Sequence, residues 1–170
     1  MLGPNLTFVL SAGKTPVLMA MNEIVFDIET DGLLDKVSKI HCLCWEDENG
    51  TEGRLHRTSD IIQLFNDLPD AVYIGHTVIC YDFVVLKRLL GIEQPRNVVD
   101  TLPLAWYLHP SRNSYGLESY GEDYGVPKPV IDDWENLTTE DYIHRCSEDV
   151  KINWRLWSNL KSKLGELYDE

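Results

Sequence analysis

The sequence predicts an α/β protein in which a mixed sheet is flanked by helices. Three observations lead to this prediction. Apolar runs separated by turn residues predict three consecutive strands, after which helices and strands alternate. The chain has 170 residues, 44% of them hydrophobic, which is enough for one domain with a buried core. No apolar run approaches the length of a membrane span, so we expect no membrane partner.

Five strands are expected from short apolar or alternating runs that lie between turn-forming residues. Their ranges are 22–28, 38–46, 51–57, 71–75 and 98–99. The four residues from Asp47 to Gly50 have the composition of a tight turn, so the second and third strands should form a hairpin. The strand at 71–75 should be central in the sheet.

Helices are expected between and after the later strands. Their ranges are a short helix from about residue 58, then about 81–90, 101–108 and 115–124, and a final helix from about residue 138. Gly91 should end the helix at 81–90. Thr138, with Asp141 three residues later, resembles a capping box for the final helix. The short helix has three candidate caps, which are Thr58, Ser59 and Asp60.

Residues 1–20 are expected to be a flexible leader, and residues 21–170 the folded domain. The leader contains two Gly, two Pro and a single basic residue, Lys14. A secretory signal with a charged start is therefore not indicated. An upstream start of translation is an alternative origin for this segment, because Met21 directly precedes the first strand.

The cysteines favour a reduced, cytoplasmic protein. Among the four Cys there is no Cys-x-x-Cys pair, so we do not expect a zinc site. Cys42 and Cys44 occupy alternate positions of the second strand, which is typical of core thiols. If the chain is encoded by a phage, the expected location is the cytoplasm of the host cell.

The formal net charge of −13 argues against a protein that binds nucleic acid through a broad basic surface. It remains compatible with an enzyme that holds a short stretch of nucleic acid through metal ions. Such an enzyme would bind its substrate weakly on its own, or would depend on a partner that supplies affinity.

The most informative motif is Asp27-Ile28-Glu29 at the end of the first strand. Alternation along a strand places Asp27 and Glu29 on the same face. Two neighbouring carboxylates at the end of a core strand repel each other and resist desolvation, and a divalent cation relieves both effects. The pair therefore predicts half of a metal site.

Two further acids are candidates for the other half. Asp82 lies near the start of a helix that follows the strand at 71–75, where ligands gather in α/β sheets. Asp149 lies in the final helix, beside apolar residues. Each also has an ordinary interpretation, because Asp82 could be a helix cap and Asp149 a solvated acid. The joint occurrence of the three motifs favours the metal site.

These motifs resemble those of the DEDD superfamily of 3′–5′ exonucleases, whose fold is a ribonuclease H-like mixed five-stranded sheet flanked by helices. Asp27-Ile28-Glu29 matches the first motif, and Tyr81-Asp82 matches the second. The third motif is an Asp on the last helix, matched by Asp149. His144 lies five residues before it, the spacing of the His-bearing (DEDDh) subfamily. The Tyr-bearing subfamily has its Tyr four residues before this Asp, where the chain has Arg145.

A closer resemblance, over about residues 21–165, is to the proofreading exonuclease domain of phage replicative DNA polymerases. The segments that carry it are Asp35 to Cys42, Gly75-His76, Asp100-Thr101-Leu102 and Leu117-Glu118. The chain departs from these domains in two places. They carry a Tyr-type third motif, and their second motif has Asn where this chain has Thr77.

The resemblance implies hydrolysis of phosphodiester bonds with two Mg²⁺ or Mn²⁺ ions roughly 4 Å apart. Asp27 would bridge both ions, and Glu29 and Asp149 would help to hold one of them. Asp82 would act on the other, mostly through water. His144 would take the proton of the attacking water, which suits histidine at neutral pH. Its alternative is an exposed surface residue, because residues five apart on an ideal helix differ by about 140° in direction.

Substrate contacts are predicted less sharply. Aromatic side chains can stack on a terminal base, and basic side chains can contact phosphates. The candidates for substrate binding are Thr30, His76, Tyr81 and Tyr115. Basic candidates, for which solvated surface charge is the commoner state, are Arg112, Lys128 and Arg145.

The leading functional hypothesis is a 3′–5′ exonuclease that acts on single-stranded DNA 3′ ends. A ribonuclease that uses the same site on RNA is the first alternative. A non-catalytic subunit of a replisome is the second, and its acidic surface would dock a separate DNA polymerase. The presence of all four carboxylates and His144 argues against the second alternative.

Overall fold

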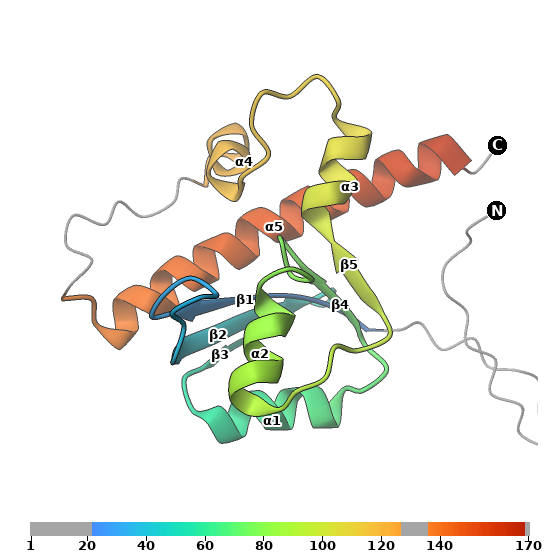
Figure 1. The fold of residues 1–170 in the computed structure, drawn as a ribbon. Coiled ribbons are helices and arrows are strands. Elements are labelled where there is room, and N and C mark those ends of the chain that lie inside the picture. The colour runs from blue at the N-terminus through green and yellow to red at the C-terminus, as the bar shows by residue number, and fades with distance from the viewer. Residues whose placement is uncertain (1–21, 127–135, 169–170) are drawn as a thin grey trace, which may run out of the picture.

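The computed structural model describes residues 22–126 and 136–168. Residues 1–20, the expected leader, lie outside the described residues, as does Lys128. The described chain forms a five-stranded sheet with helices on both faces (Figure 1). The predicted α/β architecture is therefore confirmed.

The sheet is mixed, and its strand order is β3-β2-β1-β4-β5. The strands are β1 (Glu23–Thr30), β2 (Ile40–Asp47), β3 (Glu52–Leu55), β4 (Val72–Gly75) and β5 (Val98–Asp100). Strand β2 is antiparallel to β1 and β3, whereas β1, β4 and β5 are parallel. All five predicted strands are confirmed. The middle strand of the sheet is β1, and β4 is the interior strand beside it.

The five predicted helices are also confirmed. They are α1 (Thr58–Asp67), α2 (Asp82–Leu90), α3 (Thr101–Leu108), α4 (Leu117–Tyr124) and α5 (Thr139–Tyr168). Gly91 ends α2 in the left-handed conformation, with φ of 70°. The capping box of α5 is present, because Asp141 Oδ2 accepts from the Thr138 N–H at 2.8 Å and Thr138 Oγ1 accepts from the Asp141 N–H at 3.2 Å.

The predicted cap of α1 is wrong. The N-cap is Arg57, and its side chain makes no capping hydrogen bond. The helix begins one residue earlier than the polar residues require, because the Arg57 carbonyl already accepts from the N–H groups of Asp60 and Ile61. The Ser59 hydroxyl instead donates to the side chain of Asp60 at 3.0 Å.

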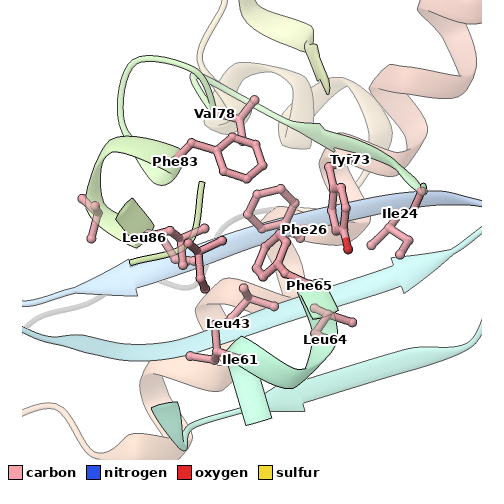
Figure 2. Close-up of a cluster of buried hydrophobic side chains, with 14 of the residues drawn as sticks. Ile24, Phe26, Leu43, Ile61, Leu64, Phe65, Tyr73, Val78, Phe83 and Leu86 are labelled. Atoms are coloured by element: carbon pink, nitrogen blue, oxygen red, sulfur yellow. The ribbon is translucent and has the colours of Figure 1, made fainter. Parts of the chain in front are cut away.

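Alternation along β1 divides the core into two clusters, one on each face of the sheet. Ile24, Phe26 and Ile28 point toward α1 and α2, and the Phe26 ring lies at the centre of this cluster (Figure 2). Its centroid is 5.4–5.9 Å from the rings of Phe65, Tyr73 and Phe83. This aromatic cluster fixes β1 against the two helices.

The opposite face of the sheet is covered by α5, which contacts β1 and β2 and is in turn contacted by α3 and α4 (Figure 1). Val25 is buried in this second cluster together with the α5 residues Val150, Leu156 and Leu160. Asp27 and Glu29 follow Val25 at alternate positions of β1, so they lie on the face that α5 covers. Among the described residues, no helix combines the length and the apolar character that a membrane crossing requires.

Candidate metal centre

Three of the predicted carboxylates come together where α5 crosses the end of β1. One carboxylate oxygen from each of Asp27, Glu29 and Asp149 lies within 4.8 Å of the other two. Asp149 is buried, at 5% exposure. Residues that are far apart in the sequence therefore meet at one point, because β1 and α5 pack directly against each other.

The pairing of β1 with its neighbours leaves the end of this strand accessible to further side chains. The last residue of β1 that pairs with β4 is Val25, which faces Ile74. From Asp27 onward, β1 runs past the end of β4, and its pairing with β2 shifts register between Glu29 and Thr30. The chain after β4 turns away into α2, which leaves the end of β1 accessible to side chains from α2.

Asp82, the first residue of α2, lies near this end of β1. Its side chain is 5% exposed. Burial raises the pKa of Asp82 to about 8, and the negative charges of Asp100 and Glu29 act in the same direction, against a hydrogen bond from the Ile28 backbone. The effect of Glu29 and the bond from Ile28 place Asp82 beside the Asp-x-Glu motif. It is not a member of the group within 4.8 Å, which contains three of the four predicted acids.

The donor set fits a hard divalent cation. Carboxylate oxygens are the ligands that Mg²⁺ and Mn²⁺ prefer. Three carboxylates at this separation in a partly buried site repel one another, and Asp149 and Asp82 are both removed from solvent. Bound cations would offset this repulsion, which an apolar core cannot do. Asp27, Glu29 and Asp149 are the residues that would hold them, with Asp82 adjacent.

Arg145 adds a positive charge to this group. It lies on α5 one helical turn before Asp149, and its Nε donates to Glu29 Oε1 at 2.8 Å. The side chains of Arg145 and Glu29 are 22% and 15% exposed, so this ion pair is largely shielded from water. The sequence indicated Arg145 only as one of three basic candidates. Its spacing of four residues from Asp149, which puts both side chains on one helix face, is the signal that could have identified it.

His144 lies in the second turn of α5 and is exposed. Its neighbour Arg145 is the residue of this turn that reaches Glu29. The expected angular separation of His144 from Asp149 follows from the regular helix through this turn. The role of His144 as a base therefore stays a prediction.

Among the predicted substrate contacts, Thr30 and Tyr81 lie together beside the carboxylate group. Thr30 Oγ1 is 2.5 Å from the Tyr81 hydroxyl, and Tyr81 donates to the Gly32 carbonyl at 2.6 Å. Tyr115 lies apart from them, before α4, and its hydroxyl donates to the His109 carbonyl at 2.8 Å. These bonds position the residues, and contact with a substrate stays a prediction for each.

His76 belongs to a polar network under the site. Its Nδ1 is 2.9 Å from Thr101 Oγ1, which also donates to Asn153 Oδ1 at 2.7 Å. Thr101 and Asn153 are buried. Asn153 follows Asp149 by one turn of α5, so the network supports the helix face that carries the carboxylate. Thr101 was predicted only as part of the segment Asp100-Thr101-Leu102, and Asn153 was missed, although its spacing of four residues from Asp149 was the available signal.

Asp100 organises the loop between β4 and α2. Its carboxylate accepts from the backbone N–H groups of Thr77 at 2.9 Å, Ile79 at 3.2 Å and Leu102 at 3.1 Å. Thr77 has a positive φ of 68°, the only such value at a described residue other than glycine. The proofreading domains that the chain resembles have Asn at this position, whereas this chain has Thr. The backbone here is left-handed, a conformation that Asn adopts readily and a β-branched residue does not.

Arg112 is engaged elsewhere. Its Nη1 forms an ion pair with Asp123 at 2.5 Å, and its guanidinium lies 4.0 Å from the centroid of the Tyr120 ring. These contacts attach the segment before α4 to that helix. Of the three basic candidates, Arg145 is therefore the one that the described structure places at the carboxylates.

Three thiols lie behind the carboxylates. The sulfur atoms of Cys42, Cys44 and Cys146 are within 4.8 Å of one another, and all three residues are buried. The Cys146 thiol donates to the Asp27 carbonyl at 3.2 Å, and burial raises its pKa well above the usual range. The cluster joins α5 to β1 and β2 next to the site. Its sulfur atoms are close enough for a thiophilic ion, although the sequence has no Cys-x-x-Cys pair.

Comparisons with known proteins support this fold. No family model matches the chain. A DNA polymerase III of the PolC type from Lacticaseibacillus paracasei is 24% identical over an alignment of 188 residues, gaps included, which takes in 89% of this chain. The chain spans only 12% of the length of that polymerase.

Solved structures resemble the chain over most of its length. NrnC from Brucella melitensis superposes with a TM-score of 0.66 and 19% identity, covering 86% of this chain and 75% of its own. Other structures of NrnC contain pGG or Mg²⁺. RNase D from Escherichia coli, an exoribonuclease, has a TM-score of 0.61 at 19% identity, covering 85% of this chain and 40% of its own. The strand order and these superpositions show that the chain has a ribonuclease H-like fold.

Proposed function

We propose that this chain is a metal-dependent 3′–5′ exonuclease that hydrolyses phosphodiester bonds at single-stranded DNA 3′ ends. The observation that supports this most directly is the meeting of Asp27, Glu29 and Asp149 oxygens within 4.8 Å, on a fold that nucleases share. The buried Asp82 beside them completes the set of four acids that the resemblance implies. NrnC with bound Mg²⁺ supports the choice of metal.

In this proposal, two Mg²⁺ or Mn²⁺ ions supply Lewis acidity to the attacking water and the leaving oxygen. Asp27, Glu29 and Asp149 would hold the cations at the end of β1. Asp82 contributes from the start of α2, and its burial keeps this side of the site free of bulk water. His144 takes up the proton of the attacking water.

The similarity to a PolC-type polymerase favours DNA as the substrate, and a DNA polymerase as a partner. A ribonuclease is the second candidate, because the exoribonuclease RNase D superposes over 85% of the chain. With a net charge of −13, the protein offers little general attraction to either polymer, so recognition should concentrate at the carboxylate end of the sheet.

The test is a cleavage assay with single-stranded DNA and RNA oligonucleotides of the same sequence, each labelled at the 3′ or the 5′ end. Mg²⁺ or Mn²⁺ is added to each reaction. A ladder that shortens DNA from its 3′ end is the expected result. A ladder with RNA alone would favour the ribonuclease. No cleavage with either metal would refute both enzymes and favour the non-catalytic subunit.

Two variants make this assay specific. Asp149→Asn should abolish cleavage, which excludes a contaminating nuclease as the source. Asp70→Asn is the matched control, because Asp70 is an exposed acid in the turn before β4. It should cleave at the rate of the unmodified protein.

A further inference from the structure

Helix α5 brings both an anion and a cation to the same site. Asp149 and Arg145 are one turn apart, so their side chains leave the helix in similar directions. Arg145 Nε is 2.8 Å from Glu29 Oε1, and Glu29 is itself a member of the carboxylate group. The guanidinium therefore lies beside the position that a cation would occupy between Glu29 and its partners.

Arginine cannot act here as a proton acceptor. Its guanidinium stays protonated in proteins, and it has five donors and no acceptor. Arg145 occupies the position at which the Tyr-bearing exonucleases carry their Tyr. Its contribution must therefore come from its charge and its donors, and not from acid–base chemistry.

The charges indicate what this contribution is. Three ionised carboxylates and one guanidinium leave two negative charges, which a single divalent ion balances. A second divalent ion would give the site a net positive charge until a phosphate arrives. Arg145 and an incoming cation also act on the same carboxylate, because Arg145 Nε donates to Glu29 Oε1 and Glu29 is a member of the carboxylate group.

We propose that Arg145 is a built-in counter-cation, which pairs with Glu29 in the metal-free protein and transfers to a substrate phosphate when the ions and the strand bind. The planar guanidinium donates two parallel hydrogen bonds, which match a phosphate as well as a carboxylate. This inference rests on the proposed function. It implies that nucleic acid tightens metal binding and, by linkage, that metal tightens the binding of nucleic acid.

The test measures Mn²⁺ affinity without nucleic acid, by electron paramagnetic resonance of the free ion. Arg145→Gln removes the competing charge and should tighten Mn²⁺ binding roughly tenfold, as expected for a cation a few ångströms away in a partly buried site. Arg145→Lys keeps the charge and should stay close to the unmodified protein. Arg57→Gln is the matched control, because Arg57 is an exposed arginine at the start of α1. The Arg57→Gln protein should bind Mn²⁺ with the affinity of the unmodified protein.

A second titration adds single-stranded DNA with a phosphorothioate at its 3′-terminal linkage, which slows cleavage. The unmodified protein should bind Mn²⁺ more tightly with this DNA present, and Arg145→Gln should show a smaller gain. Unchanged or weaker Mn²⁺ affinity in Arg145→Gln, or an equal gain with DNA, would overturn the role of Arg145. If the unmodified protein and Asp149→Asn bind Mn²⁺ equally poorly, the metal site itself is refuted, and the proposed function with it.

Discussion

The hydroxyl of Tyr81 lies 2.5 Å from Thr30 Oγ1. Tyr81 directly precedes the buried Asp82, and Thr30 directly follows Glu29. The Gly32 carbonyl accepts from the Tyr81 hydroxyl at 2.6 Å and also lies 3.0 Å from Thr30 Oγ1, so the two hydroxyl protons are shared among these three oxygens. This set of bonds connects the start of α2 to the end of β1, and so fixes the distance between the two acidic motifs.

Tyr81→Phe should therefore loosen the site without removing the ring. Loss of the hydroxyl should lower the free energy of unfolding by about 1 kcal/mol, the usual value of such a bond, as measured by urea denaturation. Tyr81→Leu also removes the aromatic face. If the ring stacks on a terminal base, the Leu variant will have a higher KM than the Phe variant. A Phe variant as stable as the unmodified protein would show that the bond has no structural value.

Most of the fold could be predicted because its signals are local. A continuous apolar run identifies β1, and Gly91 identifies the end of α2. The α1 cap failed because three polar residues in a row offer equivalent local choices. Hydrogen bonds to the Arg57 carbonyl decide where the helix begins, and they do not depend on the side chains of those residues.

The same difference between local and long-range signals applies to the candidate site. Asp27 and Glu29 could be paired from strand alternation alone, because their proximity is local. The spacing of Arg145 and Asn153 from Asp149 could place them on its helix face, but their partners could not be predicted, since these depend on how α5 is rotated over the sheet. That rotation is set by packing against β1 and β2 along the whole helix, and one motif does not encode it.

Thr77→Asn should stabilise the protein. Thr77 holds a φ of 68°, which costs an L-residue roughly 1–2 kcal/mol. Asn tolerates this conformation. The hydrogen bond from the backbone N–H of residue 77 to the Asp100 carboxylate does not involve the side chain of residue 77, so the substitution keeps it. The free energy of unfolding should rise by about 1 kcal/mol in urea denaturation. Thr77→Gly should relieve the same strain, with part of the gain lost to the greater freedom of the unfolded chain. If neither variant is more stable than the unmodified protein, the proposed backbone strain at Thr77 is refuted.

The metal-free protein should lose stability as the pH rises. Burial raises the pKa of Asp82 to about 8, from a usual value near 3.8. Between these values the folded protein holds a proton that the unfolded chain has released, so the free energy of unfolding falls with increasing pH and levels off above about pH 8. Asp82→Asn removes this contribution. Melting temperatures measured in EDTA from pH 5 to 9 should therefore decline less in the variant, with Asp70→Asn as the control. Equal slopes in all three proteins would contradict the raised pKa.

Mn²⁺ should raise the melting temperature of the unmodified protein, because a ligand that binds only the folded state stabilises it by mass action. Asp27→Ala should abolish cleavage and reduce this stabilisation, since Asp27 is a member of the carboxylate group. Differential scanning fluorimetry with and without Mn²⁺ measures the shift. The metal assignment would be wrong if the variant kept both its activity and the full thermal shift.

His144→Ala tests whether this residue is the base. Loss of a general base usually lowers the rate by roughly 10²–10⁴-fold. His56→Ala is the matched control, since His56 is an exposed histidine between β3 and α1. Arg145 cannot replace the imidazole as a proton acceptor. A His144→Ala enzyme with a full rate would therefore indicate that a carboxylate of the site, or solvent, activates the water.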